Sequence, residues 1–442
     1  MNEARKPTAA KEILRLAVPT LGALLVQPVL LLADSAIVGH WSTDSLAGLG
    51  LAQTVLLTIV GLCVFLAYST TAATARALGA GKLANGLKAG VDAIWLAIFI
   101  GIAVATLTAS FGGWILGLFA AEPSVISEGT KYLAVSAIGL PAMLSVQAAT
   151  GVIRGLQDTR TPLLVSLLAA VVNVPLSVVL VFTAGWGVVG AAVGTVVAQY
   201  LVAVILVSIV WKKAIQHQIS LRPEMSGVAS AWRGGVPILV RTLAMRIGML
   251  MLSACAAKLG TTQLAAHQIV LNLWNLLANG LDAVAIAAQS LTGKYLGAGD
   301  VKYVRSATRQ MTRWGVFGGT GAAALVLACS WLLPKLFSPD VDVQGAISVT
   351  LLVVVICQPL AGYVYVLDGV LMGAGDTVYL AKVSAFNLLC FIPAIVLWIW
   401  LGLQANPGLV WLWIAYGGWY MALRAVTLWI RQRSNKWIRV GD

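Results

Sequence analysis

The sequence predicts an all-α membrane protein that consists of two similar halves and about twelve transmembrane helices. Its 442 residues are 60% hydrophobic and only 10% charged, whereas a soluble domain is about 25% charged. Apolar runs of about 20 residues, the length that crosses a bilayer, recur along the whole chain. The chain also matches itself without a gap when it is shifted so that Pro19 meets Pro237. Lipid cannot satisfy an open backbone, so these spans should be helices.

The expected spans are separated by short polar connections, none long enough to form a domain outside the membrane. In the first half they are residues 13–39, 46–70, 90–110, 127–150, 162–183 and 189–211. In the second half they are residues 232–257, 263–288, 314–333, 347–372, 380–402 and 409–430.

The repeat divides the chain into an N-lobe, residues 1–219, and a C-lobe, residues 220–442. "GVIRGLQDT" (151–159) recurs as "GVLMGAGDT" (369–377) at the same offset. Six spans in each half is an even number, so both halves enter the membrane in the same direction, as parallel repeats. The matched Gly-x-x-x-Gly spacings in these segments are expected to permit close helix packing.

The charge of +13 is an orientation signal. Most Lys and Arg residues fall at the termini or in the connections after even-numbered spans, which the positive-inside rule places in the cytoplasm. We therefore expect a bacterial cytoplasmic (inner) membrane protein with both termini inside and contacts to membrane lipid. Nucleic acid is not an expected partner, and no cleavable signal peptide is expected.

Function is expected where the halves differ, because shared residues are explained by the common scaffold. Charges inside a span cost at least about 2.5–3.5 kcal/mol at its centre. We single out five such charges, each of which occurs in one half only. With their counterparts in parentheses they are Asp34 (Leu252), Asp282 (Val64), Asp368 (Thr150), Arg241 (Ala23) and Arg246 (Pro28).

Asp34 is the sole acid that we expect to be buried in the N-lobe, in the outer half of the first span. We interpret it as a titratable site in a water-filled cavity; the alternative is an aspartate near a helix end that reaches the headgroups. Arg241, Arg246, Asp282 and Asp368 form an expected C-lobe charge network, either structural or a second substrate or coupling site. Nearer the helix ends, Asp92 is interpreted as a solvated partner of Lys88, and Asp158 and Asp376 as turn or cap residues.

The chain lacks the motifs that would make it an enzyme. It has no HExxH, no GxSxG and no complete phosphate loop, and no cysteine or histidine spacing that is typical of a metal site. We expect no cofactor, and transport would have to use an ion gradient.

"PVLLLADSAIVGH" (28–40), the two "LGAG" segments and "YVLDGVLMGAGDT" (365–377) resemble the multidrug and toxic compound extrusion (MATE) family, most closely its DNA-damage-inducible protein F (DinF) branch. The resemblance covers the whole chain. It implies two six-helix lobes that form a V-shaped cleft, and a monomer that exports small organic, cationic or amphipathic substrates against H⁺ or Na⁺.

The resemblance also assigns roles to residues. Asp34 matches the family's cation-coupling aspartate, and Gln27, Asn173 and Thr195 match polar positions of the N-lobe cavity. Pro19 matches the proline at which the first helix bends, and Pro28 loosens the same helix. Ser177 stands where relatives often have a second aspartate, and the seventh span offers Arg241 and Arg246 in place of an acid.

Both departures favour H⁺ over Na⁺, because a hard cation prefers several oxygen ligands including carboxylates. The expected function is therefore a secondary active efflux antiporter that works by alternating access. The alternatives are a lipid-linked oligosaccharide flippase of the same broad superfamily and a non-transporting membrane scaffold.

Overall fold

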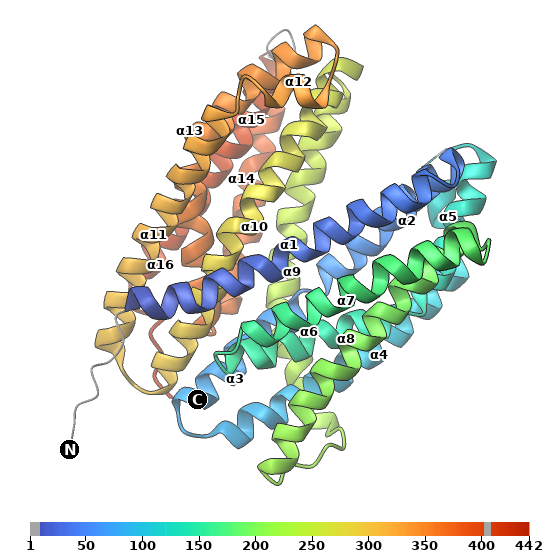
Figure 1. Cartoon of the computed structure of the whole chain (residues 1–442). Coiled ribbons are helices and arrows are strands. Elements are labelled where there is room, and N and C mark those ends of the chain that lie inside the picture. The colour runs from blue at the N-terminus through green and yellow to red at the C-terminus, as the bar shows by residue number, and fades with distance from the viewer. Residues whose placement is uncertain (1–8, 120, 402–407, 442) are drawn as a thin grey trace. The chain divides into compact units, whose positions relative to one another are not determined.

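The structure is a computed structural model that describes residues 9–119, 121–401 and 408–441. These residues form helices joined by short turns, with no strand among them (Figure 1). They pack as two compact units. The N-unit is Val18–Val236, and the C-unit is Pro237–Gly441 together with the segment that ends at Ala17. The predicted all-helical, internally repeated membrane fold is confirmed.

The limits of the two units differ from the predicted division at 219/220. The start of the first helix belongs to the C-unit, where the Glu12 carboxylate accepts hydrogen bonds from the hydroxyls of Tyr295 (3.0 Å) and Tyr303 (2.5 Å). The segment before Pro237 belongs to the N-unit, where the Asp92 carboxylate accepts from the backbone N–H of Glu224 (3.2 Å). The chain thus passes from one compact unit to the other near the matched prolines, Pro19 and Pro237. The sequence repeat instead divides the chain at the connection between the lobes.

The N-unit holds the first six of the predicted spans. Its elements are most of α1 (Ala9–Gly39), α2 (Thr43–Leu62), α3 (Phe65–Gly79), α4 (Leu83–Gly117), α5 (Pro123–Ala137), α6 (Leu140–Gly155), α7 (Arg160–Val178), the π-helix η1 (Val179–Thr183), α8 (Gly187–Gln216) and the start of α9 (Met225–Ala257).

The C-unit repeats this order with fewer interruptions. It holds the rest of α9, then α10 (Thr261–Gly297), α11 (Val301–Ala328), α12 (Leu333–Phe337), α13 (Val341–Gly373), α14 (Thr377–Trp400), α15 (Gly408–Trp413), the π-helix η2 (Ile414–Tyr420) and α16 (Met421–Arg433).

Nine helical stretches of the described residues are long and apolar enough to cross a membrane, or ten if the bent pair α5–α6 is one span. The other two predicted spans, 314–333 and 409–430, coincide largely with α11 and with α15–η2–α16. α11 carries four cations in its first half, and the last stretch contains Arg424 together with several Trp and Tyr residues. Neither is therefore as uniformly apolar as the other spans.

Equivalent helices form the centre of each unit. In the N-unit α6 packs against α3 and α4, and in the C-unit α13 packs against α10 and α11 (Figure 1). A Cβ atom on Gly151 would collide with Thr70 and Ala67 of α3, and one on Gly369 would collide with the Ala285 carbonyl of α10. The matched glycines therefore permit the close approach that the sequence predicted.

The central helices are broken in the N-unit and continuous in the C-unit. The chain bends by 51° between α5 and α6, where Gly139 precedes Pro141. The equivalent stretch of α13 has Cys357 before Pro359 and remains one helix. Proline removes a backbone hydrogen bond in both units, and the additional glycine in the N-unit fits the position of its sharper break.

Candidate functional site

The Asp34 carboxylate lies in the interior of the N-unit, on α1, with 3% of the residue exposed. The Thr195 hydroxyl on α8 donates a hydrogen bond to Asp34 Oδ2 (3.1 Å). The Asn173 side chain on α7 donates to the Thr195 oxygen (3.2 Å). Three residues that are far apart in sequence thus form one chain of hydrogen bonds. Charge-assisted hydrogen bonds of this kind hold an ionised carboxylate in place.

The local structure of α7 brings its polar residues onto this face. Asn173 and Ser177 are one turn apart, so their side chains lie on the same side of the helix. Pro175 lies between them, inside the helix, and the π-helix η1 follows directly. π-helical turns occur frequently at functional sites. Both Asn173 and Ser177 are buried.

Three oxygen atoms at this site have no hydrogen-bond partner among the described residues. They are Asp34 Oδ1, Asn173 Oδ1 and Ser177 Oγ. A buried oxygen without a protein partner can take a hydrogen bond or a cation from a bound ligand or water. An ionised Asp34 could accept a proton or a cationic group here, because no cation of the described residues contacts it.

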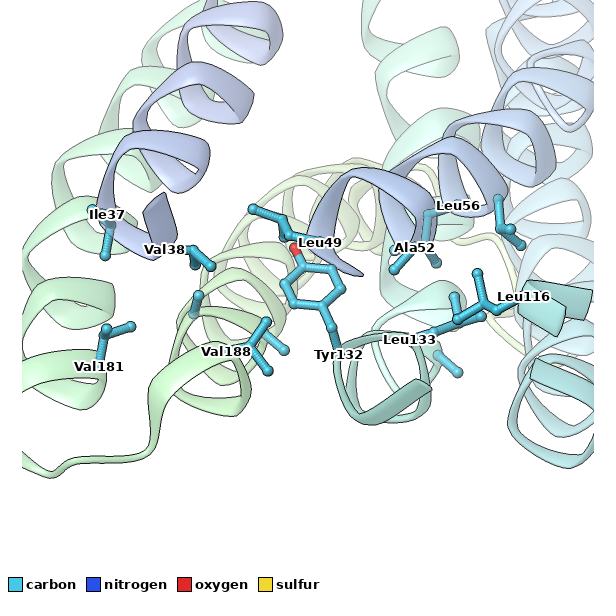
Figure 2. Close-up of a cluster of buried hydrophobic side chains, with 14 of the residues drawn as sticks. Ile37, Val38, Leu49, Ala52, Leu56, Leu116, Tyr132, Leu133, Val181 and Val188 are labelled. Carbon is cyan, nitrogen blue, oxygen red and sulfur yellow. The ribbon is translucent and has the colours of Figure 1, made fainter. Parts of the chain in front are cut away.

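Tyr132 was missed by the sequence reasoning, because a tyrosine within an apolar span gives no distinguishing signal. It is buried on α5, and its hydroxyl lies close to the side chains of Thr195, Ser136 and Gln53. Figure 2 shows its ring among apolar side chains of several helices. Tyr132 therefore connects the polar site to the apolar cluster beside it.

The apolar cluster begins one turn after Asp34 along α1. Ile37 and Val38 pack there with Leu49 of α2 and Val188 of α8, and all four are buried (Figure 2). Aliphatic side chains offer no hydrogen bonds to water, so this cluster separates the Asp34 carboxylate from the nearby end of the helix. The burial argues against the alternative of a headgroup-facing aspartate.

The remaining predicted N-lobe residues do not contact Asp34. Gln27 is exposed and makes no hydrogen bond within the described part of the chain. Pro19 and Pro28 lie inside α1, which continues as one helix through both of them. The bend expected at Pro19 stays a prediction.

In the C-unit, Asp368 of α13 is enclosed by two arginines. Arg241 of α9 donates from Nε to both carboxylate oxygens (3.1 Å each) and pairs through Nη2 with Oδ2. Arg424 of α16 donates from Nη2 to Oδ2 (2.8 Å). All three side chains are buried. This acid is thus saturated by cations, unlike Asp34.

Arg241 and Asp368 of the expected C-lobe network meet directly. Asp282 is half-buried and Arg246 is exposed. Arg424 was missed, although a signal existed. It is a charge inside a predicted span whose counterpart in the first half is the apolar Leu206. The criterion that selected Asp34 would have selected Arg424 as well.

Three acids near the helix ends have structural partners. Asp92 is 2% exposed and pairs with Lys88 (3.0 Å), so the expectation of a solvated residue is wrong. The start of α9 covers it. Asp158 accepts from the backbone of Arg160 and Thr161, which confirms its cap role. Asp376 instead pairs with Arg431 through two hydrogen bonds of 2.5 and 2.9 Å.

No group of three or more His, Cys, Asp or Glu residues that could hold a metal ion occurs in the part of the chain that the structure describes. The N-unit site therefore offers one carboxylate together with neutral oxygens. Such a set is suited to binding a proton, a monovalent cation or an organic ammonium group.

The chain is similar along most of its length to several known proteins. The chloroplastic protein DETOXIFICATION 44 of Arabidopsis thaliana is 32% identical over 83% of this chain and 72% of its own length. The DNA damage-inducible protein F of Escherichia coli is 26% identical over 97% of this chain and 94% of its own length. A mutant of the Vibrio cholerae MATE transporter VcmN has the same fold, with a TM-score of 0.86 at 21% identity over 98% of both chains.

The MatE family model matches residues 19–179 and again residues 237–397. The two matches are separated by the offset of the internal repeat, and together they cover most of the chain. The chain therefore belongs to the MATE family of multidrug and toxic compound efflux transporters.

Proposed function

We propose that this protein exports an organic, cationic or amphipathic compound across the bacterial cytoplasmic membrane in exchange for H⁺, and that Asp34 is the exchange site. The observation that carries the proposal is the state of the Asp34 carboxylate. One oxygen is held by Thr195 and the other has no partner among the described residues. Relatives from Thermotoga maritima and Pseudomonas putida are each named probable multidrug resistance protein NorM, which also supports export.

Exchange requires that the proton and the substrate cannot occupy Asp34 at the same time. When Asp34 is ionised, its free oxygen can balance a cationic group of the substrate. When it takes up a proton, that charge disappears and the substrate loses its partner. Because no other acid of the described residues contacts Asp34, one protonation removes the negative charge of this site. The hydrogen bond from Thr195 keeps the carboxylate oriented in both states.

The proton gradient supplies enough free energy for this work. One charge that moves across 100 mV contributes about 2.3 kcal/mol, and one unit of ΔpH contributes about 1.4 kcal/mol. For a neutral substrate exchanged one-to-one with H⁺, their sum would support a substrate concentration ratio of several hundredfold across the membrane. A monovalent cation exchanged for H⁺ moves no net charge, so its export would depend on ΔpH alone.

Na⁺ is a second candidate for the coupling ion. The unpartnered oxygens of Asp34, Asn173 and Ser177 are of the type that Na⁺ binds. The set contains one carboxylate only, since Ser177 occupies the position where relatives often carry the second. A hard cation gains most of its affinity from charged oxygens. We therefore favour H⁺.

The test is uptake of ethidium into everted membrane vesicles, which corresponds to export from the cell, under an imposed gradient of either H⁺ or Na⁺. The wild type should transport with ΔpH, and Asp34→Asn should lose this transport. Asp44→Asn is the matched control, because Asp44 is an exposed acid just after the end of α1 and its loss should leave transport unchanged.

Full ΔpH-driven transport by Asp34→Asn would contradict the role of this residue. Transport driven by ΔNa⁺ and not by ΔpH would overturn the choice of ion while leaving the site in place.

A further inference from the structure

The first half of α11 carries a stripe of exposed cations. Lys302, Arg305, Arg309 and Arg313 are spaced by three or four residues and all are exposed, so they lie along one face of the helix. The positive-inside pattern places this half of α11 at the cytoplasmic side of the membrane.

No acid of the described residues forms an ion pair with this stripe. Between Val301 and Ala328, α11 itself contains no Asp or Glu. Asp300, which precedes the helix, accepts a hydrogen bond from the Tyr303 backbone (3.0 Å). In the N-unit, by contrast, Lys88 is paired with both Asp92 (3.0 Å) and Glu224 (3.1 Å).

The internal repeat shows that the scaffold does not require these cations. The equivalent helix in the first half is α4, which packs against α6 as α11 packs against α13. At the positions that match the stripe, α4 carries four uncharged residues: Ala84, Leu87, Val91 and Trp95.

The stripe leads into a shallow hollow with an apolar end. A hollow of about 430 Å³ is lined by Ser306, Arg309, Gln310, Arg313, Trp314 and Phe317. A second one of about 220 Å³ adjoins it at Arg313 and Phe317 and extends to Val316 of α11 and Tyr363 of α13. Phe317 is 72% exposed. Polar and cationic groups thus change to apolar groups over two turns of one helix.

We propose that this surface of α11 is a binding site for an anionic phospholipid. Guanidinium groups bind phosphate oxygens through paired, charge-assisted hydrogen bonds, and Arg309 and Arg313 are one turn apart at the hollow. The acyl chain then lies along Phe317, Val316 and Tyr363. Basic hollows at the cytoplasmic side of membrane helices bind the headgroups of anionic lipids in this way.

The test uses the purified protein in an uncharged detergent, titrated with phosphatidylglycerol or with phosphatidylcholine, and bound lipid is counted by native mass spectrometry. The wild type should retain phosphatidylglycerol and not phosphatidylcholine. The double variant Arg309→Gln, Arg313→Gln should bind it on the order of 20-fold more weakly, since each cation near an anionic headgroup contributes about fivefold. In 1 M salt, where the Debye length is about 3 Å, the wild type should lose most of its preference.

The matched control is Lys212→Gln with Lys213→Gln, which removes two exposed cations from the end of α8 and should leave binding unchanged. Wild-type affinity in the double variant, or an equal loss in the control, would overturn the assignment. So would equal binding of phosphatidylcholine. Competition by the free headgroup, glycerophosphoglycerol, at the concentration of the lipid would show that the apolar end contributes nothing, and would overturn the lipid site.

Discussion

The two units of this transporter share a scaffold and place their buried charges at different positions. Asp34, Asn173 and Thr195 form the polar site of the N-unit, and their counterparts in the C-unit are Leu252, Phe391 and Trp413. Arg241, Asp368 and Arg424 form the charge cluster of the C-unit, and their counterparts are Ala23, Thr150 and Leu206.

The two acids differ in their partners. Asp368 is saturated by two guanidinium groups, so its charge holds α9, α13 and α16 together. Asp34 receives one hydrogen bond from a hydroxyl and keeps an oxygen without a protein partner. A buried acid with cationic partners stabilises its surroundings only while they are present. A buried acid without them is available to bind something else.

The largest effect is expected from Asp368→Asn. This change leaves Arg241 and Arg424 buried without a counterion, and breaking a buried ion pair costs about 3–5 kcal/mol. The free energy of unfolding in mixed detergent micelles should fall by about this amount. A loss below about 1 kcal/mol would show that the C-unit cluster is not structural.

The next largest loss of stability is expected from a change in the apolar cluster beside Asp34. Leu49 is fully buried there, and Leu49→Ala should lower the free energy of unfolding by about 3 kcal/mol, as a cavity in a packed core does. Leu57→Ala on the same helix α2 is the control, because Leu57 is 43% exposed. Equal effects of both changes would contradict the packing of this cluster.

A smaller effect on the free energy of unfolding is expected at the matched turns that contain Asp158 and Asp376. Arg431 pairs with Asp376 in a partly exposed ion pair, and Arg431→Gln should cost about 1 kcal/mol of unfolding free energy. The repeat places Lys213 at the equivalent position, where Asp158 is instead bonded to backbone N–H groups. Lys213→Gln should therefore have no measurable effect on unfolding. A comparable loss in both variants would mean that the two turns are held in the same way.

The smallest effect on stability is expected for Asp34→Asn. The amide has nearly the shape of the carboxylate and can still accept from Thr195, so the free energy of unfolding should change by less than about 1 kcal/mol. Transport should nevertheless be lost. Destabilisation as large as that of Asp368→Asn would remove the distinction between the two acids.

Much of the fold could be predicted from the sequence because hydropathy and the internal repeat constrain every span. Membrane spans must be helical, and the matched glycines and prolines fix where helices approach or turn. The break between α5 and α6 could not be predicted from its proline, because Pro141 and Pro359 are shared by both halves and only the first half is broken.

The sites were predicted where they depend on a charge that only one half carries. Asp34 and the pair Arg241–Asp368 were identified for that reason, and Thr195 and Asn173 by resemblance. Tyr132 gave no signal, since an aromatic residue in a span is usual. The position of Asp92 was misjudged because its burial depends on the start of α9, which lies more than 130 residues away in sequence.

The central claim is that substrate and proton exclude each other at Asp34. The most direct measurement is the release of protons when ethidium binds to the purified protein in a weakly buffered detergent solution, near the pH at which binding is half-maximal. The wild type should release a fraction of one proton per ethidium bound, rising toward one as the pH falls, and Asp34→Asn should release none. Binding without proton release in the wild type, or equal release by Asp34→Asn, would contradict this account.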